Sequence, residues 1–222
     1  MSEQLHATNA QGLYVKTDER AKLLAEIRSH ARAHGEAPVA VPVVHIILTN
    51  SAGEIRMVQR GDKAENPYMW DKAVGGHVVT EDTTLSRQAF DDNARKEAGE
   101  EIGIHDLLIA ADPIDYRRKL QREKLDLNRQ ALLYLLDHDP WQGTICISRD
   151  DGKPWLKRNN AAIYTGLYDG PFVFEDGEAV DQRAMSLERL ATELQQSPWQ
   201  YADGVRVFMQ RYAPLLGRRP AA

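Results

Sequence analysis

Apolar residues recur at helical spacing in four parts of the chain. In the first, Leu23, Ile27 and Ala31 fall on one side of a predicted helix, which Gly35 and Pro38 would end. The predicted helices cover residues 17–34, 84–102, 187–196 and about 200–213. Each presents one apolar stripe, as a helix does when it packs against a sheet or another helix.

Between the predicted helices lie short apolar runs rich in β-branched residues, which are typical of strands. The predicted strands cover residues 39–48, 55–60, 73–79, 114–121, 129–137, 161–168 and 178–185. Strands outnumber helices and do not alternate with them regularly. This pattern favours a mixed α/β or α+β fold, in which helices pack on the faces of a mixed β-sheet.

The same pattern suggests how the chain is organised. We expect an N-terminal helical arm at residues 1–38 and one domain at residues 39–222. Residues 139–160 are rich in proline and glycine, so we expect an insertion or a long functional loop there. The apolar stripe of the arm predicts packing against a second subunit, which would make the protein a homodimer.

Composition narrows the class of protein. Hydrophobic residues make up 42% and charged residues 27% of the 222 residues, which is typical of a globular protein. No apolar run is long enough for a bilayer, and the N-terminus lacks the layout of a secretory signal. The net charge of −5 disfavours general nucleic-acid binding. Cys146 is the one cysteine, which excludes an internal disulfide and fits a cytoplasmic location.

The strongest chemical signal lies at the end of the second predicted helix. Glu97, Glu100 and Glu101 stand at positions i, i+3 and i+4, so their carboxylates project from one helical face. Such triplets also occur on solvated helix faces. Here a Gly-Gly pair, Gly75 and Gly76, precedes the helix, and three acids beside a glycine-rich turn indicate a site for a hard cation such as Mg²⁺ or Mn²⁺.

In this stretch the chain resembles the Nudix hydrolase family. The family signature is glycine, five residues, glutamate, seven residues, Arg-Glu, an aliphatic residue, any residue, Glu-Glu, any residue, glycine and an aliphatic residue. Its second half matches residues 96–104, and the Gly-Gly strand matches residues 73–78. The resemblance implies a Nudix α/β/α sandwich and an enzyme that hydrolyses a diphosphate linkage of a nucleoside diphosphate or another organic diphosphate.

The resemblance also implies roles for individual residues. Glu97, Glu100 and Glu101 would bind the divalent ion, with the backbone oxygen of Gly76. Glu97, Glu101 or a later acid would orient or deprotonate the attacking water. Glu178, which opens a predicted strand, is the candidate for the later acid, although an ordinary exposed strand-end acid is the alternative.

The chain departs from the signature in its length and first glutamate, and at the arginine position. From Gly76 to Gly103 the chain has six residues more than the signature. The first glutamate position therefore holds Asp82 when counted forward and Gln88 when counted back. Lys96 replaces the signature arginine and lacks the planar fork that holds a carboxylate with two bonds.

Candidates for substrate binding lie outside the signature. Arg117, Arg118 and Lys119 belong to a cation-rich stretch that could hold phosphates, or could be a solvated hairpin. Trp70 lies in a predicted loop and could stack on a base, or could belong to the core.

Two other functions stay open at this point. The missing glutamate and Lys96 are compatible with a module that binds a nucleotide or sugar phosphate without cleaving it. Isopentenyl-diphosphate isomerases share the fold, but they use a cysteine near the glycine-rich strand. Residues 70–80 contain no cysteine, which disfavours the isomerase.

Overall fold

The computed structural model describes residues 3–174 and 177–216 of the chain. Its centre is a mixed β-sheet in which six strands follow the order β10-β4-β3-β9-β8-β7, with β1, β2, β5 and β6 attached at the sides. The strands are β1 (Gln4–Thr8), β2 (Tyr14–Glu19), β3 (Ala40–Thr49), β4 (Ile55–Arg60), β5 (Trp70–Lys72), β6 (Val74–His77), β7 (Asp106–Ala110), β8 (Gln130–Ile147), β9 (Pro154–Leu167) and β10 (Ala179–Met185). The β3–β9 and β7–β8 pairs are parallel and the remaining pairs are antiparallel.

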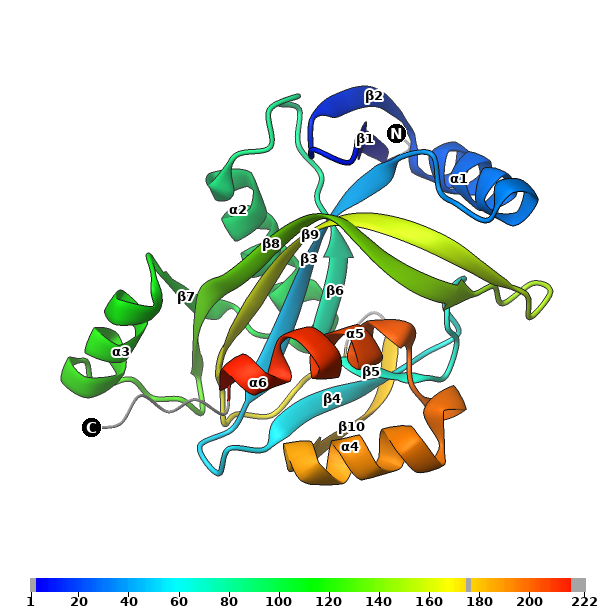
Figure 1. Ribbon diagram of the computed structural model, residues 1–222. Coiled ribbons are helices and arrows are strands. Elements are labelled where there is room, and N and C mark those ends of the chain that lie inside the picture. Colours follow the sequence, from blue (N-terminus) through cyan, green and yellow to red (C-terminus); the bar gives the residue numbers. More distant parts are fainter. Residues whose placement is uncertain (1–2, 175–176, 217–222) are drawn as a thin grey trace.

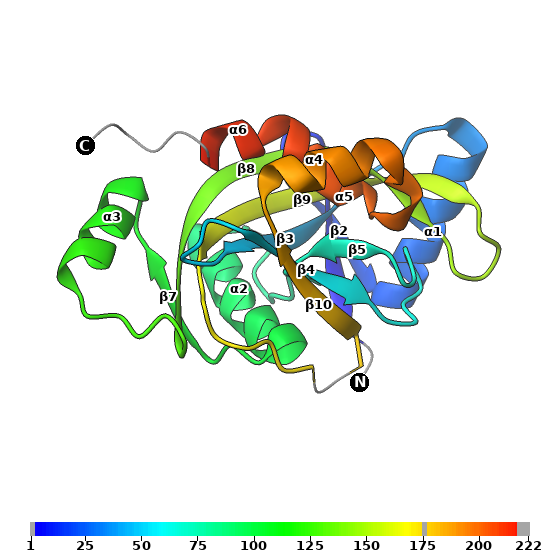
Figure 2. The same ribbon diagram turned by 90° about the horizontal axis from the view of Figure 1, so that it is seen from below.

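Helices cover both faces of this sheet, as the sequence predicts (Figures 1 and 2). They are α1 (Arg20–His34), α2 (Arg87–Ile102), α3 (Pro113–Arg122), α4 (Leu187–Gln196), α5 (Asp203–Arg211) and α6 (Ala213–Leu216), with a 3₁₀ turn η1 (Pro198–Gln200) before α5. None of the helices in the described ranges is both long and apolar enough to cross a membrane.

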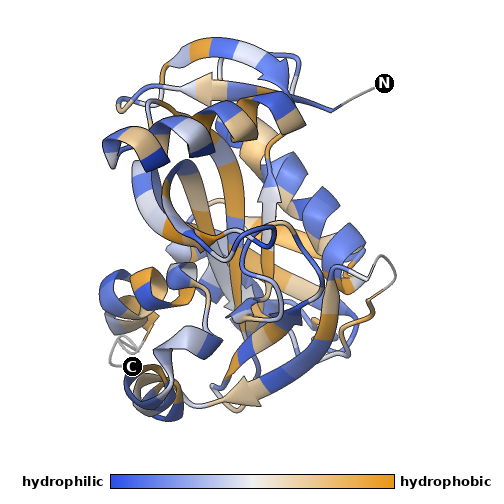
Figure 3. Cartoon of the chain, turned by 90° about the vertical axis from the view of Figure 1, so that its right-hand side faces the viewer, coloured by the Kyte–Doolittle hydropathy of each residue, from blue (hydrophilic) through white to orange (hydrophobic). Residues whose placement is uncertain are grey.

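The central strand β3 explains why the protein forms three layers. Its alternate residues Val44, Ile46 and Leu48 pack in one core with α2, whereas Val43 and Ile47 pack in a second core with α4, α5 and α6. A strand buried on both faces reads as a continuous apolar run, which is the pattern of residues 39–48. In Figure 3 the central strands are mainly apolar, while the helices show polar as well as apolar residues.

The N-terminal segment is more than the helical arm that the sequence predicts. The hairpin β1–β2 precedes α1, and β1 joins the sheet where Thr8 pairs with Ala40. The stripe of Leu23, Ile27 and Ala31 packs in a third core within the same chain. The apolar stripe is thus buried without a second subunit, and the homodimer stays a prediction.

The predicted strand at residues 114–121 is wrong, because this segment is the helix α3. Asp112 caps the helix, since its side chain accepts hydrogen bonds from the N–H groups of Ile114 and Asp115 at 2.7 and 2.8 Å. Pro113 occupies the first turn, where no N–H is needed. These signals for a helix start were present in the sequence and outweigh the weak strand pattern.

The expected loop at residues 139–160 is also wrong. This segment forms the outer halves of β8 and β9, which pair as far as Ile147 and Pro154, and only the short stretch between them turns. The register shifts between Asp139 and Gln142, so Pro140 lies at an irregularity that needs no N–H donor. The long hairpin reaches toward α1 and builds one wall of a cavity.

Candidate active site

A cavity of about 1020 Å³ opens between α1 and α2. Loop 61–66, the strand β6 and the outer parts of β8 and β9 complete its walls. Most of its lining residues are polar or charged; they include Arg28, Lys63, Glu65, Gly76, Glu97, Glu100, Glu101, Lys157 and Glu178. The volume is that of a site for a small organic molecule, and the charge of the walls suits a polar ligand.

Glu97 lies directly against the glycine strand. Its side chain is 11% exposed. A Cβ on Gly76 would lie 2.1 Å from Cδ of Glu97, so the carboxyl group fits there only because residue 76 has no side chain. Lys96 Nζ donates to Oε1 of Glu97 at 3.1 Å. The acid helix and the Gly-Gly strand identified in the sequence are therefore in contact.

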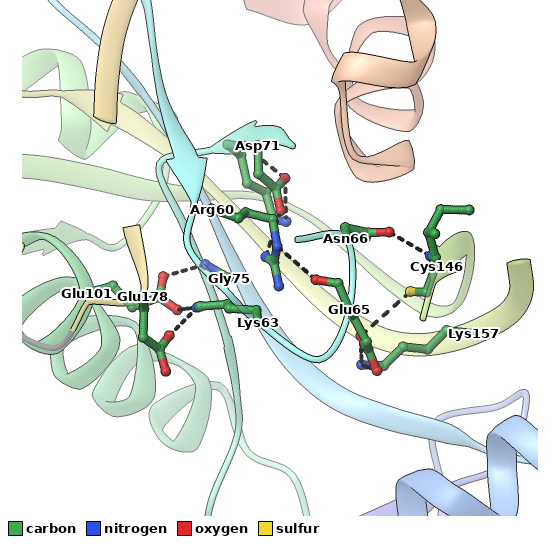
Figure 4. A network of polar contacts seen from close by, with 12 residues as sticks. Arg60, Lys63, Glu65, Asn66, Asp71, Gly75, Glu101, Cys146, Lys157 and Glu178 are labelled. Carbon is green, nitrogen blue, oxygen red and sulfur yellow. Dashed lines mark hydrogen bonds and ion pairs between the residues drawn. The ribbon is translucent and has the colours of Figure 1, made fainter. Parts of the chain in front are cut away.

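Glu101 is held by the same strand and by loop 61–66 (Figure 4). The N–H of Gly75 donates to Oε2 of Glu101 at 3.0 Å, and Lys63 Nζ donates to Oε1 at 3.2 Å. Lys63 also forms an ion pair with Glu178, at the start of β10. The structure thus brings Glu178 to the helix acids although it lies far along the chain.

Glu100 occupies the outer edge of this acidic cluster. Its side chain is 58% exposed, and Lys96 Nζ lies 3.0 Å from its Oε2. Lys96 therefore contacts Glu97 and Glu100 together, in the place of the arginine of the signature. A lysine makes these contacts as a point charge, without the two-bonded geometry of a guanidinium.

Burial changes the acidity of three of the carboxyl groups. It raises the pKa of Glu97, and Lys96 only partly offsets the effect. It raises the pKa of Glu101 in the same way, against the opposing charge of Lys63. Burial would also raise the pKa of Glu178, but the contact with Lys63 outweighs it and the pKa is lowered. The two buried helix acids therefore lack full compensation by the lysines beside them.

The donor set is compatible with a divalent cation. In residues 3–174 and 177–216, no three acidic, histidine or cysteine side chains already converge as closely as metal ligands do. An ammonium group, Lys63 Nζ, lies between Glu101 and Glu178. Mg²⁺ and Mn²⁺ prefer oxygen ligands. Carboxylate oxygens that already share one cation, with the backbone of Gly76 close by, are ligands of this type.

The expected site of the six additional residues, between the Gly-Gly strand and the acidic helix, forms a loop and the first turns of α2. The strand β6 ends at His77, and α2 begins at Arg87 after the cap residue Ser86, whose side chain accepts from the N–H of Ala89. Asp82 is exposed in this loop and Gln88 is exposed on the first turn of α2. Neither lines the cavity, so neither replaces the missing glutamate of the signature.

The predicted substrate-binding residues lie elsewhere. Arg117, Arg118 and Lys119 belong to α3, at the opposite end of the molecule from α1 (Figures 1 and 2). Trp70 packs against the core of α4 to α6, with the guanidinium of Arg183 3.9 Å from its ring centre. None of these four residues lines the cavity. The three cations lie away from it because the segment predicted as a strand is a helix on an outer edge, and Trp70 packs in the core instead.

Several charged residues of the cavity outside α2, among them Lys63, Glu65 and Lys157, had no signal in the sequence. Lys63 and Glu65 lie in loop 61–66, and Lys157 lies on β9. Lys157 Nζ contacts both carboxylate oxygens of Glu65, at 3.3 and 3.0 Å. Their partners are 38 to 115 positions away along the chain, so no local spacing reveals them.

Comparison with solved structures tests the fold independently. DR0079 from Deinococcus radiodurans superposes with a TM-score of 0.56 at 16% identity, over 94% of this chain and 98% of that chain. The MutT protein from Methanosarcina mazei superposes with a TM-score of 0.50, also at 16% identity, over 79% of this chain and 94% of that chain. The chain has the Nudix fold. The α/β/α sandwich predicted from the resemblance is thereby confirmed.

The Nudix fold is visible here in the structure and not in the sequence as a whole. No model of a known family matches the chain, and no curated protein matches it either.

Proposed function

We propose that the protein is a Mg²⁺- or Mn²⁺-dependent hydrolase that cleaves the diphosphate linkage of a nucleoside diphosphate or another organic diphosphate. One observation carries the proposal: Glu97 and Glu101 lie against the Gly75–Gly76 strand, and Lys63 joins Glu178 to Glu101, inside a cavity large enough for such a substrate. The Nudix fold supports the same activity.

In this proposal the acids of α2 hold the cation. Glu97, Glu100 and Glu101 are its side-chain ligands, and the carbonyl oxygen of Gly76, on the strand β6, is its backbone ligand. A bound divalent ion would supply charge neutralisation of the diphosphate and a more acidic water. Gly75 orients Glu101 through its N–H, which leaves the other oxygen of Glu101 directed at loop 61–66.

The same acids include the candidates for the base. We assign Glu178 to accept the proton of the attacking water, with Glu97 and Glu101 as the other candidates. The lowered pKa of Glu178 keeps its carboxylate charged at neutral pH. The cavity also carries Arg28 and Lys63, which can pair with the phosphate groups of a substrate.

The test is release of phosphate and of nucleotide from a panel of diphosphates, with Mg²⁺ and with Mn²⁺. The panel contains ADP-ribose, NADH, dinucleoside polyphosphates, nucleoside triphosphates, nucleotide sugars and isopentenyl diphosphate. Wild type is compared with Glu101→Gln and with Glu188→Gln, whose carboxylate is exposed on α4 outside the cavity. We expect metal-dependent turnover that Glu101→Gln lowers by about 100-fold or more and Glu188→Gln leaves unchanged.

A binding module without turnover is the second candidate. It is favoured by the missing signature glutamate, since neither Asp82 nor Gln88 reaches the cavity. Calorimetric titration of the same panel separates the two functions. Saturable binding without turnover under either metal would show that the protein is a binding module and not a hydrolase. Turnover that is lost in Glu101→Gln would exclude the binding module. Isomerisation of isopentenyl diphosphate in the panel would exclude both.

A further inference from the structure

Loop 61–66 is fixed at both of its ends. The N–H of Asn66 donates to the carbonyl of Ile147 at 2.8 Å, and its side-chain Oδ1 accepts from the N–H of Ile147 at 2.7 Å. At the other end, the N–H of Gly61 donates to the carbonyl of Glu178 at 2.8 Å. Hydrogen bonds at both ends therefore fix the loop across the cavity, from β8 to the residue before β10, and Lys63 projects from a defined position. We call loop 61–66 the strap.

Lys63 is the contact between acids of two separate elements. Its ammonium group lies 3.2 Å from Oε1 of Glu101 on α2 and also bonds Glu178 at the start of β10 (Figure 4). The side chain of Lys63 is 20% exposed and that of Glu101 is 11% exposed, so water screens this pair only weakly. The lysine thus contacts Glu101, which the proposed function requires as a ligand of the divalent ion, and Glu178, which it requires as the base.

The local charges do not balance. Three carboxylates of α2 (Glu97, Glu100 and Glu101) meet two ammonium groups (Lys63 and Lys96) in direct contact. The cluster therefore carries an excess of negative charge that attracts a further cation. A divalent ion that binds Glu101 and an ammonium group on the same carboxylate would repel each other at such short distance.

We propose that Lys63 competes with the divalent metal for Glu101, and that metal binding displaces its ammonium group from Glu101 toward the diphosphate of the substrate. This inference rests on the proposed function, because it requires the metal site. Lys63 then has two states: it closes the acid cluster without metal, and it contacts the anionic substrate once metal is bound. The metal affinity of the protein is set by this competition.

The experiment is titration of Mn²⁺ into the protein without substrate, at neutral pH, followed by calorimetry and by the electron paramagnetic resonance signal of free Mn²⁺. Lys63→Met removes the competing charge. Lys119→Met is the matched control, because it removes one lysine from α3 at a distance from the cavity. Lys63→Arg keeps the charge on the strap, and Glu101→Gln removes a ligand.

We expect Lys63→Met to bind Mn²⁺ about tenfold more tightly than wild type, the effect of one lost charge-assisted contact. Lys119→Met and Lys63→Arg should stay close to wild type, and Glu101→Gln should bind weakly. The melting temperature without metal should fall in Lys63→Met, and its rise on adding Mn²⁺ should be larger than in wild type. If Lys63→Met only destabilised the fold, its melting temperature would fall but its affinity for Mn²⁺ would not rise.

Two results would overturn the inference in distinguishable ways. If wild type binds Mn²⁺ and Lys63→Met binds it equally or more weakly, Lys63 does not compete and the proposed hydrolase stands. If wild type and all variants fail to bind Mn²⁺ at millimolar concentration, the metal site fails, and the inference fails with it.

Discussion

Two clusters of lysine and glutamate lie at the two sides of loop 61–66, and they differ in charge balance (Figure 4). On one side Lys63 meets Glu101 and Glu178; on the other, Glu65 meets Lys157. Burial raises the pKa of Glu101. Burial acts on Glu65 in the same direction, but Lys157 outweighs it and the pKa of Glu65 is lowered.

The comparison separates a structural ion pair from a site that can accept a ligand. Lys157 is paired with one carboxylate in a buried position, and the charges cancel. Lys63 faces more carboxylate charge than it can neutralise. Removal of one partner from a compensated buried pair leaves an unpaired charge and destabilises the fold, whereas an excess of buried acids attracts added cations. A mutation of Lys157 should therefore change mainly the stability of the fold, and a mutation of Lys63 should change the affinity for a divalent cation.

The largest expected effect concerns stability. Lys157→Met leaves the carboxylate of Glu65 buried without a cation, which should lower the free energy of unfolding by about 3 kcal/mol. Urea denaturation followed by circular dichroism measures it. Mn²⁺ affinity should stay within about twofold of wild type, since Lys157 does not contact the acids of α2. A changed Mn²⁺ affinity with unchanged stability would reverse the roles of the two clusters.

The next effect concerns the acid cluster itself. In Gly76→Ala the new methyl group would overlap the carboxyl group of Glu97, which must rotate out of the site. We expect turnover to fall by about 10- to 100-fold while the protein stays folded, because the end of a flexible side chain can move. Gly204→Ala is the control, since its methyl group would lie 3.6 Å from Lys72 Nζ on the wall of the same cavity. Equal losses in both variants would contradict the role of Glu97.

A third cluster, which is compensated like that of Glu65 and Lys157, predicts how stability depends on pH. Asp71 is buried beside Arg60 and Lys72, at 3.0 and 3.2 Å. Burial would raise the pKa of Asp71, but these cations outweigh it and lower the pKa from 3.8 to about 2. The charged form therefore stabilises the fold above about pH 4, and this contribution of about 2 kcal/mol is lost as the pH falls toward about 2.

Comparison of wild type with Asp71→Asn isolates that contribution. The variant should be less stable at pH near 5, and the difference between the two proteins should shrink by about 2 kcal/mol as the pH is lowered to about 2. Urea denaturation at each pH measures the difference. A difference in stability that does not change with pH would mean that the pKa of Asp71 is the same in the folded and the unfolded chain.

The smallest expected effect tests the predicted role of α3 cations in substrate binding, which the fold does not support. Replacing Arg117, Arg118 and Lys119 together by alanine should change KM for the diphosphate substrate by no more than about twofold, because α3 does not line the cavity. Steady-state kinetics measures it. A rise in KM of tenfold or more would return these residues to substrate binding and would place a second part of the substrate at α3.

Local sequence was sufficient for the acidic helix. Glu97, Glu100 and Glu101 share a face because helical geometry places residues three and four apart side by side, and Gly103 ends the helix with a φ of 71°. The central strand β3 was also predictable, since a strand buried on both faces must be apolar throughout. These features depend on neighbours in the chain, and they hold in the folded protein.

Elements with weak or mixed local signals were decided by tertiary contacts. The N-terminal hairpin has its residues Tyr14 and Val15 exposed, so it shows no clear alternation of apolar and polar residues. The hairpin of β8 and β9 runs through Pro140 because the register shifts there. In α3 the local signal existed, as the cap residue Asp112 shows, and the weak strand pattern concealed it.

The sequence by itself determined the layers of the fold and the acids that lie on α2, because periodicity and spacing are properties of neighbouring residues. Only the tertiary structure decided which charges meet those acids. Lys63 reaches Glu101 across 38 positions and Glu178 across 115. Such pairs depend on where the strap crosses the cavity, and packing and hydrogen bonds distant in sequence set that path.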